Sequence, residues 1–378
     1  MRSVTQIPVL ENIPVLVRSP FNVPIANGAV ANAFRLKEAL PTIDYLTKHH
    51  ARVILCSHIG RADTETLKPV YDALARYVPG LAFCPEAVGP AARKAARELS
   101  PGGVLLLENL RRYPGEKKND PKFAAELAEL ADVFVQDTFD VLHREHAGVV
   151  GVPKLLPSYA GFLVEREVAE LSKALTPASP SLAIISGAKF ETKEPVLNKL
   201  ITLYDTVFVG GAIANDFLKA KGYPVGKSLV SGTDAGHLKP LLENKRLTLA
   251  VDSLVAPAGG TRADARVAEI GDVKDGEAIL DVGPKTSAML ADLVKRSKTV
   301  LWNGPLGNYE NGFVDGTDAL AEAIAGSGAR STIGGGDTVA SIEKLGINDR
   351  FSFISTGGGA MLDFLAQGGV LPGLRALD

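Results

Sequence analysis

The chain has little cysteine, few aromatic side chains and almost no net charge. Its 378 residues include two cysteines, one tryptophan and 6% aromatic residues, with a formal net charge of −2. Cys56 and Cys84 lie far apart and form no CxxC pair, so neither a disulfide framework nor a zinc site is indicated. The small net charge gives no reason to expect a nucleic acid or an acidic membrane surface as a partner.

Long apolar runs are absent as well. Proline and charged residues interrupt every stretch that could span a membrane, and the first eight residues, MRSVTQIP, contain no run typical of a signal peptide. We therefore expect a cytoplasmic protein that binds no membrane. The composition is 46% hydrophobic, and a chain of this length has room for two or three domains of roughly 100–200 residues each.

Several common catalytic and nucleotide-binding motifs are also missing. The sequence has no G-x-S-x-G or H-E-x-x-H, so hydrolase and zinc-peptidase interpretations have no support, and no G-x-G-x-x-G follows the first predicted strand. Residues 222–228, GYPVGKS, resemble a P-loop but are one residue short and follow a predicted helix. His143 and His146 have a spacing compatible with metal ligands, but Arg144 between them favours anion binding or a solvated surface.

Short apolar strands alternate with amphipathic helices through the first half of the chain. Strands are predicted at residues 14–17, 52–57, 104–107 and 133–135, and helices at residues 36–50, 67–77, 91–99 and 121–130. This alternation is typical of a mostly parallel sheet covered by helices on both faces. Ligands of such sheets bind beyond the carboxyl ends of the strands, so the residues that follow each strand are candidates for a site.

Guanidinium and imidazole side chains follow nearly every one of these strands. They are, in chain order, Arg18, His58, Arg61, Arg111, His143, Arg144 and His146, and Arg35 opens the first long helix. A single surface arginine needs no explanation, but recurrence at successive strand ends predicts a pocket. Arginine forks match phosphate and carboxylate oxygens, so this half is predicted to bind a small, multiply anionic molecule.

In the second half of the chain, glycine is the residue that recurs after the predicted strands. A long predicted helix at residues 159–175 is interpreted as the connection between two domains. Beyond it, glycine-bearing loops at residues 186–193, 210–212, 303–310, 334–338 and 355–359 each follow a predicted strand. Packing turns would explain one or two such loops, whereas five favour close approach of the backbone to a nucleotide. Residues 252–264 are the least regular part and are predicted to form a surface excursion.

The loop at residues 333–338, IGGGDT, turns from a predicted strand into a predicted helix with apolar residues at Val339, Ile342 and Leu345. Glycines there let backbone N–H groups approach a phosphate at the helix N-terminus. The carboxylate of Asp337 would repel that phosphate unless Mg²⁺ lay between them. The alternative is a plain tight turn in which Asp337 caps the helix.

Taken in order, the strand ends resemble those of phosphoglycerate kinases, and the similarity extends from Val15 to Leu377. The similar segments include Arg18-x-x-Phe-Asn22, Ser57-His58-Ile-Gly-Arg61, Asn109-Leu-Arg111, His143-Arg-x-His146, Gly187-Ala-Lys189-x-x-x-Lys193, Trp302-Asn-Gly-Pro305, Gly334-Gly-Gly-Asp-Thr338 and Ser355-Thr-Gly-Gly-Gly-Ala360. So many collinear segments make coincidence implausible.

The resemblance implies a two-domain α/β fold. Two Rossmann-like, three-layer α/β/α domains with mostly parallel sheets would be joined by the helix at residues 159–175. The phosphoglycerate-binding domain would comprise residues 1–158, with residues 360–378 packing back on it. The nucleotide-binding domain would comprise residues 176–359.

The resemblance also implies an enzyme of glycolysis, a phosphotransferase with a carboxyl group as acceptor. The reaction is the reversible transfer of the acyl phosphate of 1,3-bisphosphoglycerate to Mg·ADP, which gives 3-phosphoglycerate and ATP. Transfer would be direct and in line, with the cleft closing to exclude water, and it needs no general base. The partners would be these small molecules and Mg²⁺, with no nucleic acid, and the enzyme would be a monomer.

Site residues carry over by motif. Phe21, Asn22, Arg35, His58, Ile59, Gly60, Arg61, Arg111 and Arg144 would bind the glycerate ligand, and Lys193, Glu310, Gly335, Gly336, Asp337 and Thr338 would bind the nucleotide. Arg35, Lys189 and Lys193 would be the catalytic residues, with Arg35 and Lys189 neutralising the phosphoryl group in flight. Asp337 would bind Mg²⁺, and Glu310 would bind the ribose hydroxyls.

Four positions depart from the family pattern. Pro20 stands where the family has an aspartate that accepts a hydrogen bond from the glycerate, and Asp140 lies in a turn where the family has glycine and smaller residues. Ser186 replaces a glycine, and Ala62 replaces a proline. Two alternatives follow: a kinase of the same fold with altered acceptor specificity, or a non-catalytic ligand-binding paralogue. A lost hydrogen bond is worth roughly 1–2 kcal/mol, so altered glycerate recognition is expected rather than loss of transfer.

Overall fold

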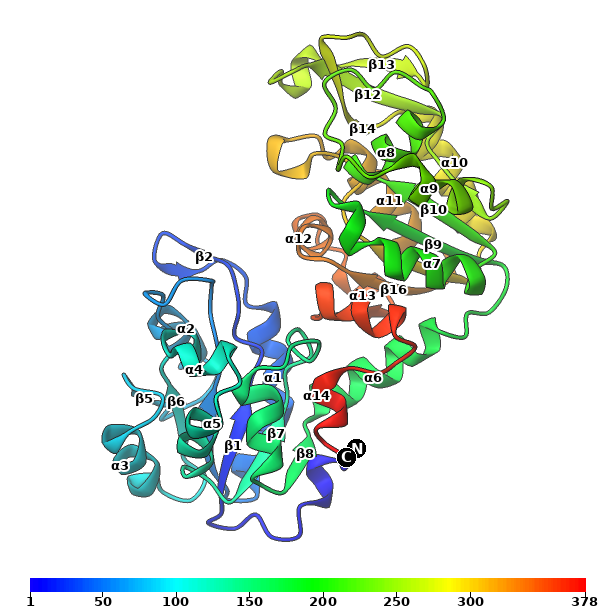
Figure 1. Ribbon diagram of the computed structural model, residues 1–378. Coiled ribbons are helices and arrows are strands. Elements are labelled where there is room, and N and C mark those ends of the chain that lie inside the picture. The colour runs from blue at the N-terminus through cyan, green and yellow to red at the C-terminus, as the bar shows by residue number, and fades with distance from the viewer. The chain divides into compact units, whose positions relative to one another are not determined.

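The computed structural model describes residues 1–378, which divide into two compact units (Figure 1). The first unit comprises Met1–Ala169 together with Val370–Asp378, and the second comprises Glu170–Gly369. Each unit contains a six-stranded sheet in which every strand pair is parallel. None of the helices combines the length and the apolar character needed to cross a membrane.

The sheet of the first unit has the order β5-β6-β4-β1-β7-β8. Its strands are β1 (Pro14–Arg18), β4 (Arg52–Cys56), β5 (Ala82–Cys84), β6 (Val104–Leu107), β7 (Val133–Gln136) and β8 (Ser158–Ala160). The helices are α1 (Phe34–Lys48), α2 (Lys68–Leu74), α3 (Pro90–Glu98), α4 (Pro114–Lys117) and α5 (Pro121–Ala128), and a small hairpin joins β2 (Ile25–Ala26) and β3 (Ala29–Val30).

Alternate residues of the central strands point to opposite faces of this sheet, and each face has its own core. Val15 and Val17 of β1 belong to a cluster with the apolar side chains of α1 and α2. Leu16 belongs to a second cluster with those of α3 and α5. Because strands buried on both faces read as continuous apolar runs, the sequence pattern identified them well. The expected α/β fold with mostly parallel sheets is confirmed.

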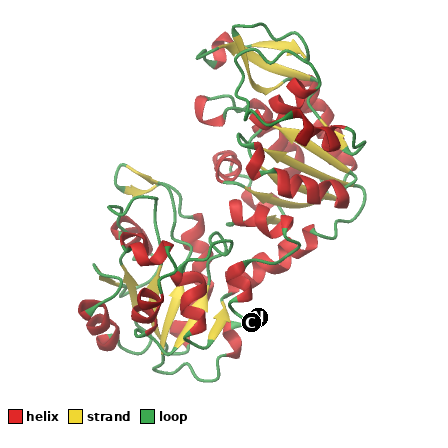
Figure 2. Cartoon of the chain, in the orientation of Figure 1, coloured by secondary structure: helices red, strands yellow, loops and turns green.

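The sheet of the second unit has the order β11-β10-β9-β15-β16-β17. Figure 2 shows its strands in yellow among the helices that cover them. Its strands are β9 (Ser181–Ser186), β10 (Thr206–Gly210), β11 (Leu247–Thr248), β15 (Thr299–Asn303), β16 (Arg330–Gly334) and β17 (Phe353–Ile354). The helices are α7 (Glu194–Leu203), α8 (Ala212–Ala220), α9 (Ala235–Leu242), α10 (Pro284–Arg296), α11 (Asp315–Ala325), α12 (Gly336–Leu345) and α13 (Gly359–Ala366). The fully buried Trp302 of β15 lies in the main core of this unit.

The expectation of an irregular surface excursion at residues 252–264 was wrong. This segment begins with β12 (Asp252–Pro257), the central strand of a three-stranded antiparallel sheet completed by β13 (Arg266–Glu269) and β14 (Glu277–Val282). A small core containing Val255, Ala268 and Val273 supports the sheet. The irregular composition belongs to the hairpin connection that follows β12, where Gly259 adopts a positive φ of 80°.

The connecting helix is shorter than the sequence predicted. It is α6 (Phe162–Ala174), and Tyr159 lies instead in β8, in register with Val135 of β7. The backbone N–H of Leu163 donates to Asp137 Oδ1 at 3.0 Å, which fixes the start of the helix. The first residues of a segment with helical periodicity therefore form an edge strand, because their backbone groups pair with β7.

Residues 360–378, which were predicted to pack together on the first domain, divide between the two units. Helix α13 belongs to the second unit, where it packs against α7 with Ala360, Met361 and Phe364 fully buried. Gly368 and Gly369, both with positive φ, follow that helix, and only Val370–Asp378 return to the first unit. There α14 (Pro372–Arg375) lies beside residues 147–151, and Gly373 N donates to the carbonyl of Leu142 at 2.8 Å.

Candidate functional site

The loops that follow β1 and β4 are joined through Asn22 in the first unit. Its side-chain Oδ1 accepts from the backbone N–H of Gly60 at 3.1 Å, and its carbonyl accepts from Arg35 Nη1 at 2.6 Å. The neighbouring Phe21 is fully buried and donates its backbone N–H to Ser57 Oγ at 3.1 Å. Phe21 therefore positions Asn22 through the core and presents no side chain to a ligand.

Asn109, which was not among the predicted site residues, organises the loop at residues 57–61. Its Oδ1 accepts from the N–H groups of Ile59 at 3.2 Å and Arg111 at 3.0 Å, and its Nδ2 donates to the carbonyl of Ile59 at 3.1 Å. Arg111 Nη1 also donates to the carbonyl of Gly60. Ile59 is buried, so its contribution is the position of its backbone.

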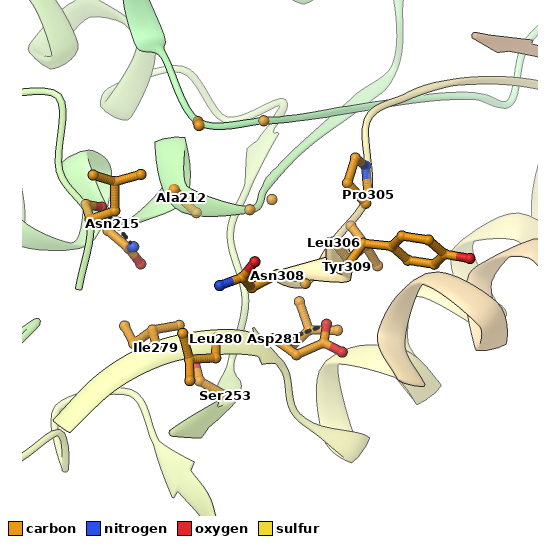
Figure 3. A pocket seen from close by; sticks show the side chains of 18 of the residues that line it. Ala212, Asn215, Ser253, Ile279, Leu280, Asp281, Pro305, Leu306, Asn308 and Tyr309 are labelled. Atoms are coloured by element: carbon orange, nitrogen blue, oxygen red, sulfur yellow. Dashed lines mark hydrogen bonds between the residues drawn. The ribbon is translucent and has the colours of Figure 1, made fainter. Parts of the chain in front are cut away.

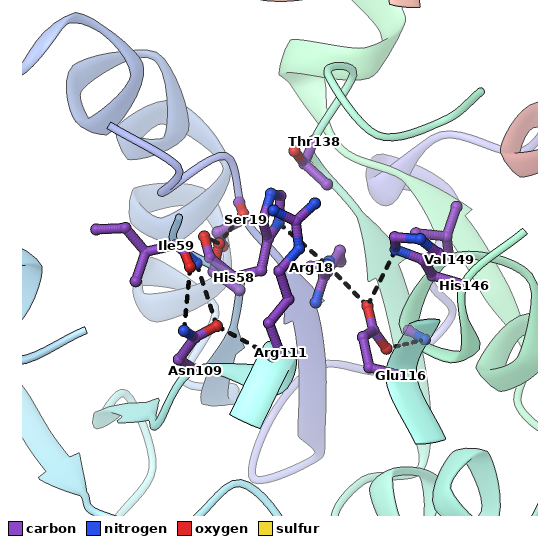
Figure 4. A network of polar contacts seen from close by, with 12 residues as sticks. Arg18, Ser19, His58, Ile59, Asn109, Arg111, Glu116, Thr138, His146 and Val149 are labelled. Atoms are coloured by element: carbon purple, nitrogen blue, oxygen red, sulfur yellow. Dashed lines mark hydrogen bonds and ion pairs between the residues drawn. The ribbon is translucent and has the colours of Figure 1, made fainter. Parts of the chain in front are cut away.

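A buried ion pair supports His58 from beneath this loop (Figure 4). Arg18 Nη2 and Glu116 Oε1 are 3.0 Å apart with both side chains fully buried, and His58 Nδ1 lies 3.3 Å from the same guanidinium nitrogen. The other oxygen of Glu116 accepts from Gly148 N at 2.8 Å. Burial, followed by the charges of Arg18 and Arg111, holds the pKa of His58 well below its usual value, so the ring is neutral at pH 7.

Positive charge is crowded on this face of the first unit. Burial and the neighbouring Arg144 and Arg18 lower the pKa of Arg111 to about 10, and burial together with these arginines lowers the pKa of His146 to about 4. Arg18 Nε and Nη1 and Arg111 Nε are buried and have no hydrogen-bond partner. The crowded charge of these guanidinium groups makes this part of the first unit electropositive, which would attract an anion.

The remaining predicted glycerate residues lie nearer the surface. Arg61 is exposed, and its carbonyl accepts from Lys117 Nζ at 3.0 Å. Arg144 is exposed and donates through Nε to His143 Nε2 at 3.2 Å. Arg35 forms an ion pair with Asp140, with Nη1 and Oδ2 3.0 Å apart. Sequence reasoning did not find Glu116 or the Asp140 partnership, since each joins residues about a hundred positions apart.

The second unit contains a cavity of about 340 Å³ at the carboxyl ends of β9 and β10 (Figure 3). Apolar groups make much of its wall, including Ala212, Leu218 and Leu306, and Asn308, Glu310 and Asp337 add polar groups. Asp281 also lines it, with its oxygens held by the N–H groups of Val282 at 2.8 Å and Gly316 at 3.0 Å. Largely apolar cavities with a few polar groups are typical of small-molecule sites.

Lys193 and Lys189 differ sharply in environment. Lys193 Nζ donates to Asn303 Oδ1 at 3.1 Å, and burial lowers the Lys193 pKa to about 8, although the carboxylate of Asp363 opposes the shift. Lys189 is exposed and precedes a short turn at residues 190–192. Sequence reasoning placed both lysines in the site but did not identify Asn303 as a partner.

The glycine turn at residues 334–338 forms the start of α12, as predicted. Gly335 is the N-cap residue, with a φ of 103° that side chains rarely allow, and no side chain caps the helix. Asp337 is exposed and lines the cavity, so the alternative in which it caps the helix was wrong. Thr338 is buried, and its Oγ1 accepts from Gly304 N at 3.1 Å, which ties this turn to the loop after β15.

The glycines of these loops fall into two groups, according to whether the protein itself would crowd a side chain at their positions. A Cβ atom at Gly211 would lie 2.5 Å from Ser186 Oγ and 2.9 Å from Gly187 N, so packing between loops explains that glycine. Gly336, Gly358 and Gly359 have nothing within 4 Å of such an atom and face open space. Close approach of a ligand to the backbone is therefore an explanation for the second group only.

Asp337 fits a magnesium ion that is shared with a nucleotide. No group of three or more His, Cys, Asp or Glu side chains is arranged to hold a metal ion. Mg²⁺ commonly takes one or two carboxylates, several waters and substrate phosphates rather than a cage of protein ligands. An exposed carboxylate in the first turn of a helix, at the wall of the cavity, suits that donor set.

Comparison with known proteins identifies the family. A sequence profile described as Phosphoglycerate kinase matches residues 4–368. The chain belongs to the phosphoglycerate kinase family. A phosphoglycerate kinase of Moorella thermoacetica is 44% identical over 381 residues, covering 97% of each chain, and one of Herpetosiphon aurantiacus is 45% identical over 377 residues, covering 96% of this chain and 95% of the relative. The resemblance inferred from the strand ends is thereby confirmed.

Solved structures of phosphoglycerate kinases share the fold. The enzyme from Coxiella burnetii superposes with a TM-score of 0.84 at 38% identity, covering 99% of this chain and 98% of the other. The enzyme from Pyrococcus horikoshii has a TM-score of 0.90 at 30% identity, covering 100% and 98%.

Proposed function

We propose that the chain catalyses the phosphoglycerate kinase reaction, the reversible transfer of the acyl phosphate of 1,3-bisphosphoglycerate to Mg·ADP. The observation that carries this proposal is the cationic face around Asn22, where Arg18, Arg111 and Arg144 lie close enough together that the charges of the other two lower the pKa of Arg111. Such a face suits a small ligand that carries both phosphate and carboxylate groups. The family of the chain and the cavity of the second unit support the same conclusion.

The first unit would bind the glycerate ligand. Asn22, Arg35, His58, Arg61, Arg111 and Arg144 would supply side-chain contacts, while Phe21, Ile59 and Gly60 would set the backbone of the two loops. Because His58 is neutral, it can donate one hydrogen bond to an anion without adding charge.

The second unit would bind the nucleotide. The cavity would take the nucleoside, with Glu310 on the ribose hydroxyls, and the phosphates would lie along the turn from Gly335 to Thr338. Backbone N–H groups at the start of α12 would face the phosphate oxygens. Asp337 would hold Mg²⁺, whose role when bound is to neutralise charge on the phosphates.

The chemistry would need positioning and charge neutralisation but no covalent intermediate on the protein. An acyl phosphate is already activated, and the acceptor is a phosphate oxygen, so no general base is required. Arg35, Lys189 and Lys193 would stabilise the negative charge of the phosphoryl group in transfer. Closure of one unit onto the other, a monomeric state and a cytoplasmic location in glycolysis belong to this proposal.

A coupled assay with 3-phosphoglycerate and Mg·ATP tests the proposal, with Asp337→Ala as the control that should lose most of the activity. No turnover of 3-phosphoglycerate, together with turnover of another phosphorylated carboxylate, would favour altered acceptor specificity, which Pro20 and Asp140 motivate. Nucleotide binding without turnover of any acceptor would favour a non-catalytic paralogue.

A further inference from the structure

Asp140 is a carboxylate within the cationic face of the first unit. Its Oδ2 pairs with Arg35 Nη1 at 3.0 Å, and its Oδ1 accepts from Thr138 Oγ1 at 2.5 Å. The Asp140 side chain is 6% exposed and that of Arg35 is 24% exposed. The same Nη1 donates to the carbonyl of Asn22 at 2.6 Å, so one guanidinium nitrogen joins Asp140 to the loop that follows β1.

The loops that carry Asn22 and Asp140 leave adjacent strands at the same edge of the sheet. Arg18 at the end of β1 is in register with Gln136 at the end of β7. The β1 loop offers Pro20, which has no carboxylate and no N–H donor, whereas the β7 loop offers Asp140. Asp140 is near enough to Arg111 for its charge to raise the pKa of that guanidinium.

The Asp140 carboxylate has acceptor capacity to spare. A carboxylate offers about four lone-pair sites, and Arg35 and Thr138 each take one of them in the hydrogen bonds described above. The other polar groups of the cationic face are mainly hydrogen-bond donors, namely guanidinium groups and the neutral ring of His58. A ligand that carries a hydroxyl donor beside its anionic groups therefore finds an acceptor at Asp140.

We propose that Asp140 is a specificity-determining residue that orients Arg35 and accepts a hydrogen bond from the hydroxyl of a phosphorylated hydroxy acid. The site then favours a ligand with a hydroxyl next to its carboxylate over the same ligand without it. This inference rests on the proposed function for the identity of the ligand, 3-phosphoglycerate.

The test compares 3-phosphoglycerate with 3-phosphonooxypropanoate, which is the same molecule without the hydroxyl. Affinities are measured by calorimetry, and kcat/KM is measured with Mg·ATP, for the parent and for Asp140→Asn, Asp140→Leu and Asp140→Gly. Asp132→Asn serves as the control. Asp132 is an exposed acid that precedes β7, and its substitution by asparagine removes the same charge as Asp140→Asn.

The parent and Asp132→Asn are expected to prefer the hydroxy acid by about tenfold or more, because only the hydroxy acid can donate a hydrogen bond to the charged carboxylate of Asp140. Asp140→Leu and Asp140→Gly should reduce that preference to near unity. Asp140→Asn keeps an acceptor oxygen but no charge, so it should retain most of the preference while binding both anions more tightly.

An unchanged preference in both Asp140→Leu and Asp140→Gly would overturn the proposal, since a purely structural or electrostatic role changes both affinities by the same factor. If one variant fails to fold, as judged by circular dichroism, the other decides. Binding of 3-phosphoglycerate without turnover would refute the proposed function and leave the calorimetric comparison of Asp140 intact.

Discussion

Lys193 Nζ donates to the side-chain oxygen of Asn303 at 3.1 Å, and partial burial of the side chain lowers the pKa of Lys193 to about 8. In the free protein the lysine therefore loses its proton as the pH rises through about 8, whereas a bound phosphate needs the charged form. Nucleotide affinity should fall by up to about tenfold per pH unit above that value. Titration of Mg·ADP between pH 7 and pH 9.5 measures the slope, and Lys193→Arg, which stays charged, should flatten it.

Arg35 and Lys189 are expected to act on transfer more than on nucleotide binding. Alanine at either position removes a charge proposed to stabilise the phosphoryl group, so kcat should fall by about a hundredfold or more while the nucleotide Kd changes only a few-fold. Steady-state kinetics and nucleotide titration of the same preparations separate the two effects. Equal losses in both would contradict the assigned roles.

Asp337→Ala should weaken the binding of Mg·nucleotide more than that of the metal-free nucleotide. The carboxylate is exposed in the first turn of α12, where it disfavours a bare phosphate and favours one that is bridged by a cation. Calorimetric titrations of ADP with and without Mg²⁺ give the difference. Asp337→Asn, which keeps an oxygen ligand, should show an intermediate loss of affinity. If a substitution improved the binding of ADP both with and without Mg²⁺, Asp337 would not be a metal ligand.

Glu116→Gln should destabilise the first unit strongly. It leaves Arg18 buried without its counter-charge, and breaking a buried pair in this way costs about 3–5 kcal/mol. Urea unfolding followed by circular dichroism measures the change in the free energy of unfolding. Glu98→Gln is the matched control, because Glu98 is an exposed partner of Lys94 at 3.9 Å and such pairs contribute at most about 1 kcal/mol.

Asp137→Asn should change how stability depends on pH. Burial raises the pKa of Asp137 from 3.8 to about 8. Between these values the folded state holds a proton that the unfolded state has lost, so the parent loses stability as the pH rises, by up to about 1.4 kcal/mol per unit. The asparagine variant keeps an acceptor for Leu163 N and lacks that titration.

Denaturant unfolding at pH 5, 6, 7 and 8 tests this expectation. The free energy of unfolding of the variant should increase steadily relative to that of the parent as the pH rises. A constant difference in the free energy of unfolding across the range would show that Asp137 is ionised in the folded protein throughout.

Most strands of both main sheets were predictable from the sequence, because apolar runs buried on two faces leave a strong local signal, whereas the edge strands β5, β8 and β11 were missed. The three-stranded antiparallel sheet around β12 was missed, since it encloses only a small core and its apolar residues are interrupted by charged residues and glycines. The first residues of the predicted connecting helix fit helical periodicity equally well, and only pairing of Tyr159 with Val135 shows that they form a strand.

Local pattern also explains which parts of the candidate sites could be predicted. Arginines and glycines at strand ends are visible one by one, and the sequence placed them correctly on their loops. Glu116 pairs with Arg18 across 98 positions, and Asp281 enters the cavity from the small antiparallel sheet. Such partners are defined by tertiary structure, so no short segment contains the information that identifies them.

The hydrogen bond between Gly373 N and the Leu142 carbonyl shows that residues close to the C-terminus complete the packing of the first unit. The first unit is discontinuous in sequence, so during translation residues 370–378 become available to it only after the whole of the second unit has been synthesised. The loop that carries Asp140 and Arg144 therefore gains its contact with Gly373 later than its contacts within residues 1–169.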